Sequence, residues 1–219
     1  MFKKNISVFA FLFILNSCGI QQKTWSENGW YAYIKTSSEK QEPSKVYEFS
    51  DGMIKMHGEN IGYLMSKKSY KNFELSLEYR WNMDEKYNKG KGKKNSGVMY
   101  NIPTDSPDRI WPKGIQFQIK ENTTGDFIFM DQVTAKVNGK LVEPGASVTS
   151  PKFSENEKPY GEWNSIVIKS VNGKITQFLN EKLVNECVEA SSAEGRVSLN
   201  YEGSAIDFRN IRLKQISAE

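Results

Sequence analysis

Two short stretches of the chain place polar side chains at every second position, between apolar ones. One stretch presents Glu78 and Arg80 in this way, and the other presents Gln116 and Gln118. A period of two is typical of a β-strand. A carboxylate serves as a general base, a guanidinium stabilises developing negative charge, and amides orient a polar substrate. We therefore expect these four side chains to meet in one cleft, the alternatives being a Glu78–Arg80 ion pair and a solvated sheet face.

Four further residues are candidates for the same site. Asp126 is a second candidate base, although an acidic residue that follows Gly125 also suits a turn. Arg209 either stabilises negative charge or satisfies backbone carbonyls. Asn95 either binds a hydroxyl group or belongs to an Asn-Ser-Gly turn. Trp111 lies in a proline-containing loop that either shapes a pocket or covers the core.

The last predicted strand contains a change of phase. Ile206 and Phe208 share one face, as do Ile211 and Leu213, but the two pairs are out of step by one residue. One extra residue restores the alternation, and a β-bulge supplies such a residue. We therefore predict a bulge near Arg209, which would re-aim its side chain.

The remaining pattern predicts an all-β chain. Roughly a dozen short segments read as strands, and no long stretch keeps an apolar period of 3.6 residues. Asn138-Gly139 and Asn172-Gly173 are the residue pairs that two-residue type I′ turns favour, because both positions need a positive φ. The expected fold class is therefore a two-sheet antiparallel sandwich.

The first residues resemble an export signal. Lys3 and Lys4 precede an apolar run over residues 6–15, which is too short to span a bilayer as a mature helix. Leu15-Asn16-Ser17-Cys18 resembles a bacterial lipobox, so we expect residues 1–17 to be removed and Cys18 to be acylated. The chain would then be a membrane-anchored lipoprotein of the bacterial cell envelope, in the periplasm or at the outer membrane. The alternative is an ordinary secretory signal with a chance cysteine.

Composition limits the classes of partner. Removing residues 1–17 takes away two lysines and no acid, so the formal charge falls from +4 to +2. This small charge favours no nucleic-acid partner. Cys187 would be the one remaining thiol apart from Cys18, so the fold must depend on its core. We expect residues 18–44 to form a tether and first segment, and residues 45–219 a single all-β domain.

Seven sequence blocks, taken in order, resemble one protein family. The blocks are Gly62-Tyr63-Leu64, Tyr70-x-x-Phe73-Glu74-Leu75-x-x-Glu78-Tyr79-Arg80, Asn95-Ser96-Gly97-Val98, Gly114-Ile115-Gln116-Phe117-Gln118-Ile119, Thr124-Gly125-Asp126, Gly161-Glu162-Trp163-Asn164 and Phe208-Arg209-Asn210-Ile211. Together they are similar to the 3-keto-disaccharide hydrolase domain over about residues 45–216. The resemblance implies a concanavalin A-like jelly roll whose concave face holds sugar.

The resemblance also implies a hydrolase or lyase reaction on an oligosaccharide or 3-keto-glycoside. A ketone at carbon 3 acidifies the hydrogen on carbon 2, a base removes that proton, and the group on carbon 1 leaves. Glu78 and Asp126 are then the candidate catalytic residues. The candidate substrate-binding residues are Arg80, Asn95, Trp111, Gln116, Gln118 and Arg209.

Two positions depart from the family pattern and leave other functions open. A glutamate is common in the family where Gln116 stands, and a glutamine is common where Asn200 stands. Glutamine does not serve as a base, so a carbohydrate-binding module without chemistry is the main alternative, and a partner-binding envelope domain is a third. A divalent metal such as calcium stays open, although the chain has no Asp-x-Asp-x-Asp loop.

Overall fold

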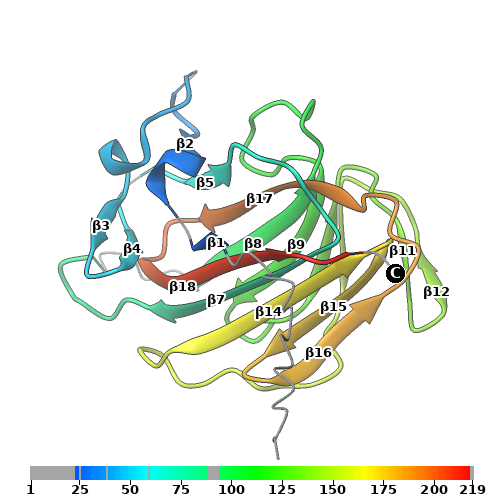
Figure 1. Ribbon diagram of the computed structural model, residues 1–219. Helices are drawn as coiled ribbons and strands as arrows, with labels where there is room; N and C mark the ends of the chain where they lie inside the picture. The colour runs from blue at the N-terminus through cyan, green and yellow to red at the C-terminus, as the bar shows by residue number, and fades with distance from the viewer. Residues whose placement is uncertain (1–22, 25, 38, 59, 88–93, 218–219) are drawn as a thin grey trace, which may run out of the picture.

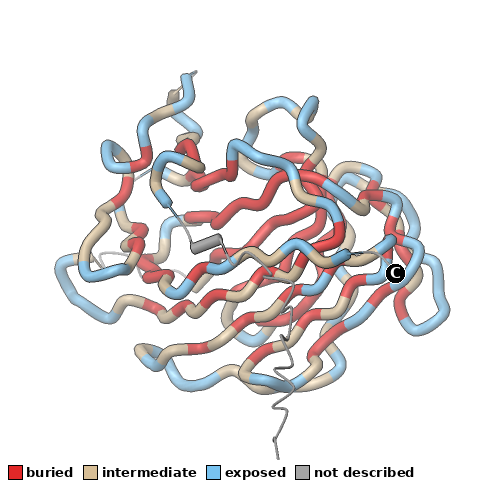
Figure 2. Tube along the Cα trace, viewed as in Figure 1, coloured by how far each residue is buried: buried red, intermediate tan, exposed pale blue. Residues whose placement is uncertain are grey.

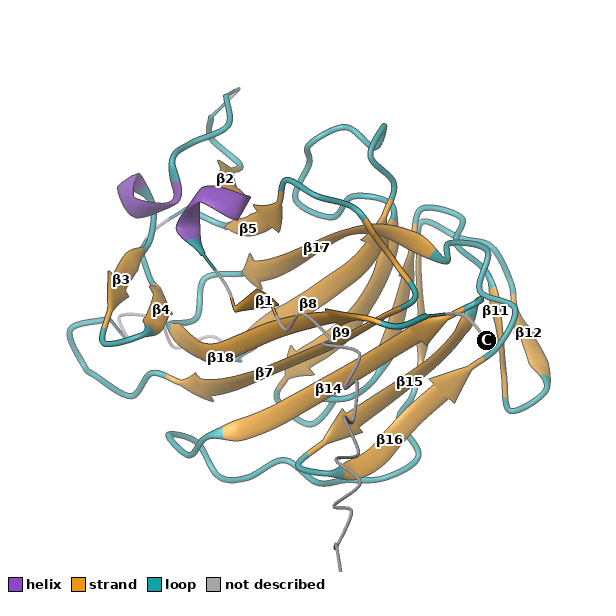
Figure 3. Ribbon diagram, in the orientation of Figure 1, coloured by secondary structure: helices purple, strands orange, loops and turns teal. Residues whose placement is uncertain are grey.

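The computed structural model describes residues 23–217, apart from positions 25, 38, 59 and 88–93. Over this part of the chain, two antiparallel sheets lie face to face, as Figures 1 and 3 show. The predicted signal segment and Cys18 lie outside the described residues. Within those residues, no helix has the length and apolar character needed to cross a membrane.

The first sheet, called sheet 1 here, has β7 and β18 near its centre. In spatial order its strands are β16 (Lys182–Cys187), β15 (Lys174–Leu179), β14 (Asn164–Val171), β7 (Phe73–Trp81), β18 (Ile206–Gln215), β4 (Met53–Met56) and β3 (Glu48–Ser50), and β1 (Lys23–Thr24) also pairs with β18. The strands β14, β15 and β16 follow one another as hairpins, as their sequence order and antiparallel pairing require.

The second sheet, called sheet 2, has β8 and β9 near its centre. In spatial order its strands are β13 (Ser147–Ser150), β10 (Phe127–Met130), β9 (Gly114–Lys120), β8 (Asn95–Ile102), β17 (Glu194–Tyr201), β5 (Gly62–Ser66) and β2 (Trp30–Ile34), and β6 (Tyr70–Lys71) also pairs with β17. Smaller elements complete the described chain. They are the hairpin β11 (Ala135–Val137) and β12 (Lys140–Val142) and the 3-10 helices η1 (Glu27–Gly29) and η2 (Pro43–Lys45).

The core lies between the two sheets because alternate residues of each long strand point into the layer between them, while β8, β9 and β17 of sheet 2 are buried on their outward side as well. In β7 the buried positions include Phe73, Leu75 and Leu77, and in β9 they include Ile115 and Phe117. Figure 2 shows the buried positions recurring along the strands of both sheets. Burial of apolar surface contributes about 25 cal/mol per Å², so this shared layer stabilises the sandwich.

The predicted turns and the predicted bulge are confirmed. Asn172 and Gly173, which join β14 to β15, have φ values of 48° and 76°. The pair Asn138-Gly139 also has two positive φ angles. The pairing of β18 with β7 shifts register between Arg209 and Arg212, where the phase of the sequence requires an extra residue. The all-β, two-sheet antiparallel architecture expected from the sequence is therefore present.

Candidate functional site

The first two pairs of candidate residues lie on opposite sides of the sandwich. Glu78 and Arg80 alternate with buried residues of β7, so their side chains point away from the core on sheet 1. Gln116 and Gln118 are also buried, but they alternate with the core residues of β9 and point away from the core on sheet 2. The core separates the two pairs, which corrects the expectation that all four share one hollow. Their functional roles stay predictions.

On sheet 1 the charged candidates bind one another. The Nε of Arg209 donates a hydrogen bond to Glu78, and the Nε of Arg80 donates to Asp207 at 2.9 Å. Both guanidinium groups stack on the ring of Trp163, at 4.6 Å for Arg80 and 3.8 Å for Arg209. The bulge thus directs Arg209 to a side-chain carboxylate rather than to backbone carbonyls. This arrangement holds neighbouring strands together through cross-strand ion pairs and cation–π contacts.

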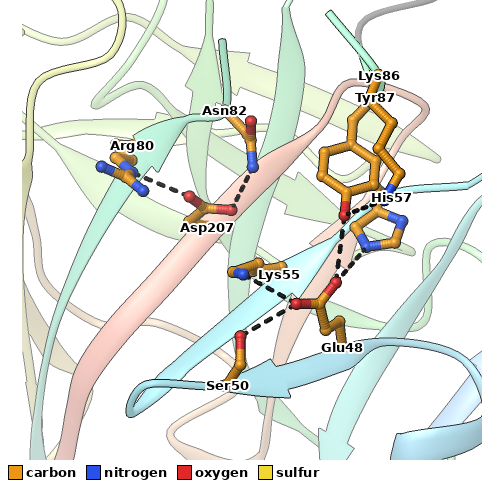
Figure 4. Close-up of polar contacts among 9 residues, drawn as sticks. All are labelled: Glu48, Ser50, Lys55, His57, Arg80, Asn82, Lys86, Tyr87 and Asp207. Carbon is orange, nitrogen blue, oxygen red and sulfur yellow. Dashed lines mark hydrogen bonds and ion pairs between the residues drawn. The ribbon is translucent and has the colours of Figure 1, made fainter. Parts of the chain in front are cut away.

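A second polar cluster adjoins this surface, as Figure 4 shows. Its centre is Glu48, which accepts a hydrogen bond from Lys55 at 2.9 Å and lies 3.5 Å from the Nε2 atom of His57. The ring of His57 stacks on Tyr87 with a centroid separation of 4.0 Å. Asp207, which binds Arg80, also accepts from Asn82. The one histidine of the chain is therefore held in a surface network on the sheet 1 side.

The outward face of sheet 2 is hollowed, and this hollow is larger than the one of about 390 Å³ that β3, β4 and Arg209 line on sheet 1. The hollow, called the sheet 2 cavity here, has a volume of about 610 Å³, and Ile128 and Met130 of β10 provide much of its apolar wall. Its wall also includes the charged, amide and indole groups of Arg109, Trp111, Gln116, Gln118, Lys120, Asp131 and Glu202. An apolar hollow with a few convergent polar groups is the usual form of a small-molecule site.

Three of its side chains and the neighbouring Asn95 form one hydrogen-bonded series. The amide of Gln116 donates to Gln118, whose amide donates to Asn95 over a long 3.5 Å contact. The amide of Asn95 then donates to the carboxylate of Glu202 at 2.6 Å. We call this series the amide relay. It joins three residues that the sequence analysis assigned to one site, and the series ends on a carboxylate.

Glu202 is the residue that the sequence analysis missed. Burial raises the pKa of its carboxyl above the ordinary value of 4.5, although the nearby donor groups of Trp111, Asn200 and Asn95 and the positive charge of Lys120 oppose the shift. A carboxylate with a raised pKa in a cavity is a candidate general base. The alternation of residues in the sequence could have revealed it, because the polar side of β17 consists of Arg196, Ser198 and Asn200. One further step of the same alternation reaches Glu202.

A glycine makes room for the relay. Gly97 of β8 lies opposite Gln118 of β9, and a Cβ atom at Gly97 would lie 2.4 Å from Nε2 and 2.7 Å from Cγ of Gln116. The side chain of Gln116 therefore crosses directly over the backbone of Gly97. Any larger residue at this position must displace it.

The loop between β8 and β9 carries the outer wall of the cavity and is held by a buried cluster. Asp108 Oδ1 accepts a hydrogen bond of 2.6 Å from each of the hydroxyls of Tyr31 and Tyr63. Arg196 donates to the hydroxyl of Tyr31 at 2.9 Å and to the carbonyls of Pro103 and Ser106. We call these contacts the Asp108 clasp. The clasp fixes the segment that presents the neighbouring Arg109 and Trp111 to the cavity.

The electrostatics of the clasp favour an ionised carboxylate. Burial alone would raise the pKa of Asp108, but the hydrogen bonds from Tyr31 and Tyr63 and the ammonium of Lys40 lower it below its ordinary value of 3.8. Arg109 extends the wall by pairing with Asp131 across the mouth of the cavity. Trp111 is 48% exposed, so its ring is available to a ligand rather than covering the core.

Asp126, which we proposed as a second base in the cleft, lies outside the sheet 2 cavity. Its carboxylate is buried and accepts a hydrogen bond of 2.9 Å from the backbone N–H of Lys152. Burial raises its pKa, although this hydrogen bond and the charge of Lys152 oppose the shift. The residue is absent from the wall of the sheet 2 cavity. The described geometry therefore gives Asp126 a role in joining β10 to the segment after β13.

The described residues contain no cluster of the side chains that usually bind a metal ion. In the described part of the chain, no group of three or more His, Cys, Asp or Glu residues is arranged to hold a metal ion. Backbone carbonyl and amide oxygens also bind calcium, so the prediction of a divalent metal stays open.

Comparisons with known proteins give the same fold and a carbohydrate-related family. Residues 23–214 match the family model described as the 3-keto-alpha-glucoside-1,2-lyase-like domain. A relative named 3-keto-disaccharide hydrolase, from Bacteroides thetaiotaomicron, is 26% identical over an alignment that covers 85% of this chain and 74% of the relative.

Solved structures of other proteins have a similar two-sheet sandwich fold. A candidate glycosyl hydrolase from Parabacteroides distasonis aligns with a TM-score of 0.60 at 18% identity, covering 87% of this chain and 89% of that one. A carbohydrate-binding module from Bacillus subtilis aligns with a TM-score of 0.56 at 12% identity, covering 85% and 96%. These likenesses confirm the concanavalin A-like sandwich as the fold.

The contact between Gly97 and Gln116 predicts the effect of one added methyl group. In Gly97→Ala, Gln116 must adopt another rotamer, and we expect the free energy of unfolding to fall by about 1–3 kcal/mol, as overpacking typically costs. Chemical denaturation measures the fall. Gly29→Ala is the control, because the nearest atom to its added Cβ lies at 3.9 Å. An unchanged Gln116 side chain in a structure of Gly97→Ala would contradict the prediction.

The Asp108 clasp predicts a pH-dependent stabilisation. Because the folded-state pKa of Asp108 is lowered, its contribution is complete above pH 3.8 and is lost as the pH falls through the folded value. We expect Asp108→Asn to lower the free energy of unfolding by about 1–3 kcal/mol at pH 7, and to speed hydrogen exchange in residues 103–113. Denaturation at pH 7 and near pH 3 should show the difference between wild type and variant shrinking with acidification. A difference that does not depend on pH would count against this role.

Proposed function

Because the chain belongs to the 3-keto-alpha-glucoside-1,2-lyase-like domain family, we propose that it cleaves 3-keto-glycosides in the sheet 2 cavity, with Glu202 as the base. The observation that carries this proposal is the position of Glu202. Its carboxylate combines a raised pKa with a place in the cavity wall beside amide, indole and cationic groups. Glu78 and Asp126, the bases suggested by the sequence, do not line this cavity.

The proposed reaction begins with removal of the proton on carbon 2 of the sugar. The ketone at carbon 3 accepts the electron pair, so an enolate forms and Glu202 becomes protonated. Collapse of the enolate restores the ketone, forms a double bond between carbons 1 and 2, and expels the oxygen substituent on carbon 1. That oxygen takes up a proton, and addition of water across the double bond gives net hydrolysis.

The charges around the cavity suit this proposal. The enolate oxygen carries the developing negative charge, and fixed donors stabilise such charge more than they stabilise the starting ketone. Lys120 and Arg109 supply positive charge to the wall. On the adjoining strand β17, the Nδ2 of Asn200 is a buried donor without a hydrogen-bond partner among the described residues. In this proposal, Lys120, Arg109 and Asn200 together stabilise the negative charge on the enolate oxygen.

The remaining groups suit a sugar ring. The exposed ring of Trp111 provides a flat apolar surface on which the C–H face of a sugar stacks. Gln116 has a buried Oε1 atom without a described partner, which is an acceptor for a substrate hydroxyl. Asn95 and Gln118 lie between this acceptor and the base. In this proposal the relay orients the base, and Trp111 orients the ring.

The proposed location follows from the N-terminal segment. Acylation of Cys18 would hold the protein on a membrane of the bacterial cell envelope, because each buried methylene contributes about 0.8 kcal/mol. An exported enzyme with this anchor would act on glycosides that reach the envelope. The support for this part of the proposal is the lipobox-like Leu15-Asn16-Ser17-Cys18 alone.

The second candidate function is carbohydrate binding without chemistry. Its support is Gln116, which stands where the family commonly has a glutamate, together with the likeness to a carbohydrate-binding module. Binding of an unoxidised disaccharide, with no turnover of its 3-keto form, would select this function. Absence of any saccharide binding would instead favour a protein-binding role.

The proposed base predicts a selective loss of activity. In Glu202→Gln we expect the kcat/KM for a 3-keto-disaccharide to fall by about 100-fold to 10,000-fold, as removal of a general base typically gives. Purified residues 19–219 and a matched plain disaccharide provide the assay and its blank. The wild-type rate should rise with pH through a value above 4.5, because the base must be ionised.

Glu78→Gln is the matched variant, since it makes the same change on the opposite sheet. We expect it to keep the wild-type rate within about twofold, because surface pairs contribute little to stability. A large loss in Glu78→Gln together with full activity in Glu202→Gln would overturn the assignment of the base. No consumption of the keto sugar by wild type, with or without divalent metal, would end the enzymatic proposal.

A further inference from the structure

We propose that a second hollow on sheet 2 binds an anionic oxygen group, such as a carboxylate or a sulfate. This hollow, called the β2 cavity here, lies where β2 and β17 begin and has a volume of about 410 Å³. The residues of its wall that matter here are Trp30, Tyr31, Lys40, Glu42, Lys67 and Arg196. It lies on the same outward face as the sheet 2 cavity, but none of these residues lines that cavity.

An unpaired donor on Arg196 is the first reason to expect an anion in the β2 cavity. Arg196 is only 6% exposed. Its two terminal nitrogens donate hydrogen bonds to the hydroxyl of Tyr31 and to the carbonyls of Pro103 and Ser106. Its Nε atom is buried and has no hydrogen-bond partner among the described residues. A guanidinium has five N–H donors, and a buried charged donor left unpaired is costly. An anionic acceptor in the adjoining cavity would satisfy this remaining donor.

The balance of charge in the wall is the second reason. Lys40, Lys67 and Arg196 each carry a positive charge, whereas Glu42 supplies one negative charge. Lys40 is partly committed, since its Nζ lies 3.4 Å from Asp108 Oδ2 and 4.3 Å from the ring centre of Tyr31. Lys67 is exposed and follows directly after β5. An anion would therefore meet the buried guanidinium of Arg196 and the exposed ammonium of Lys67.

The place of the cavity connects it to saccharide recognition. The Asp108 clasp links Tyr31 and Lys40, which line the β2 cavity, to the loop that carries Arg109 and Trp111 of the sheet 2 cavity. An anionic substituent on a saccharide and a free inorganic anion offer the same oxygen atoms to the site. Binding in the β2 cavity does not require turnover, so this inference stands or falls apart from the proposed function.

The test is a binding titration of the purified full chain at an ionic strength of about 0.1 M, where more distant charges are largely screened. Inorganic sulfate and glucuronate are the probes, and glucose is the neutral counterpart. We expect both anions to bind and glucose to leave the resonances of the Trp30 indole and Lys67 unchanged in NMR spectra. Tighter binding of glucuronate than of sulfate would assign the site to an anionic sugar, and the reverse would assign it to a free anion.

Two neighbouring lysines provide matched variants. Lys67→Met removes a charge from the wall and should weaken anion binding about fivefold, because a nearby opposite charge contributes on this scale at a partly exposed site. Lys68→Met removes the same charge one residue away, outside the wall, and should change binding less than about twofold. Both side chains are exposed, so both variants should fold. Equal weakening by the two variants, or no binding of either anion, would overturn the proposal.

Discussion

The Asp108 clasp is the contact on which the candidate site of sheet 2 depends. Asp108 accepts hydrogen bonds from Tyr31 of β2 and Tyr63 of β5, while Arg196 of β17 binds the carbonyls at the start of the same loop. A loop of this length would otherwise have many conformations to lose on ordering. Three strands of sheet 2 therefore hold one loop, and that loop forms a wall of the sheet 2 cavity.

The two outward faces of the sandwich meet different physical demands. On sheet 1, carboxylates and guanidinium groups pair across strands and stack on Trp163, so the face is satisfied by its own side chains. On sheet 2, much of the outward face is buried beneath loops, and polar atoms of Gln116 and Asn200 have no described partner. Buried polar groups are usually hydrogen-bonded, and each exception calls for an explanation, of which a bound ligand is one. The contrast places the candidate site on sheet 2.

Local features of the fold could be read from the chain because their causes are local. Positive φ angles at Asn172 and Gly173 follow from residue type, and the bulge near Arg209 follows from a break in alternation. The assignment of strands to sheets depends instead on contacts between residues far apart in the chain. The same alternation places Glu78 on one outward face and Gln116 on the other, and no feature within either strand distinguishes the two faces. Glu202 was missed for a narrower reason, since it lies one residue beyond the end of β17.

The direction of the amide relay has a consequence for the kind of ligand that the candidate site would accept. An ionised carboxylate only accepts hydrogen bonds, so Glu202 requires Asn95 to present its NH₂ group and to turn its carbonyl toward Gln118. Gln118 is oriented in turn, and its carbonyl faces the NH₂ group of Gln116. The last carbonyl in the series, on Gln116, is thereby left as an acceptor. The ionisation of one acid therefore dictates that the opposite end of the series selects a hydrogen-bond donor, and an ether or methylated oxygen there would be discriminated against.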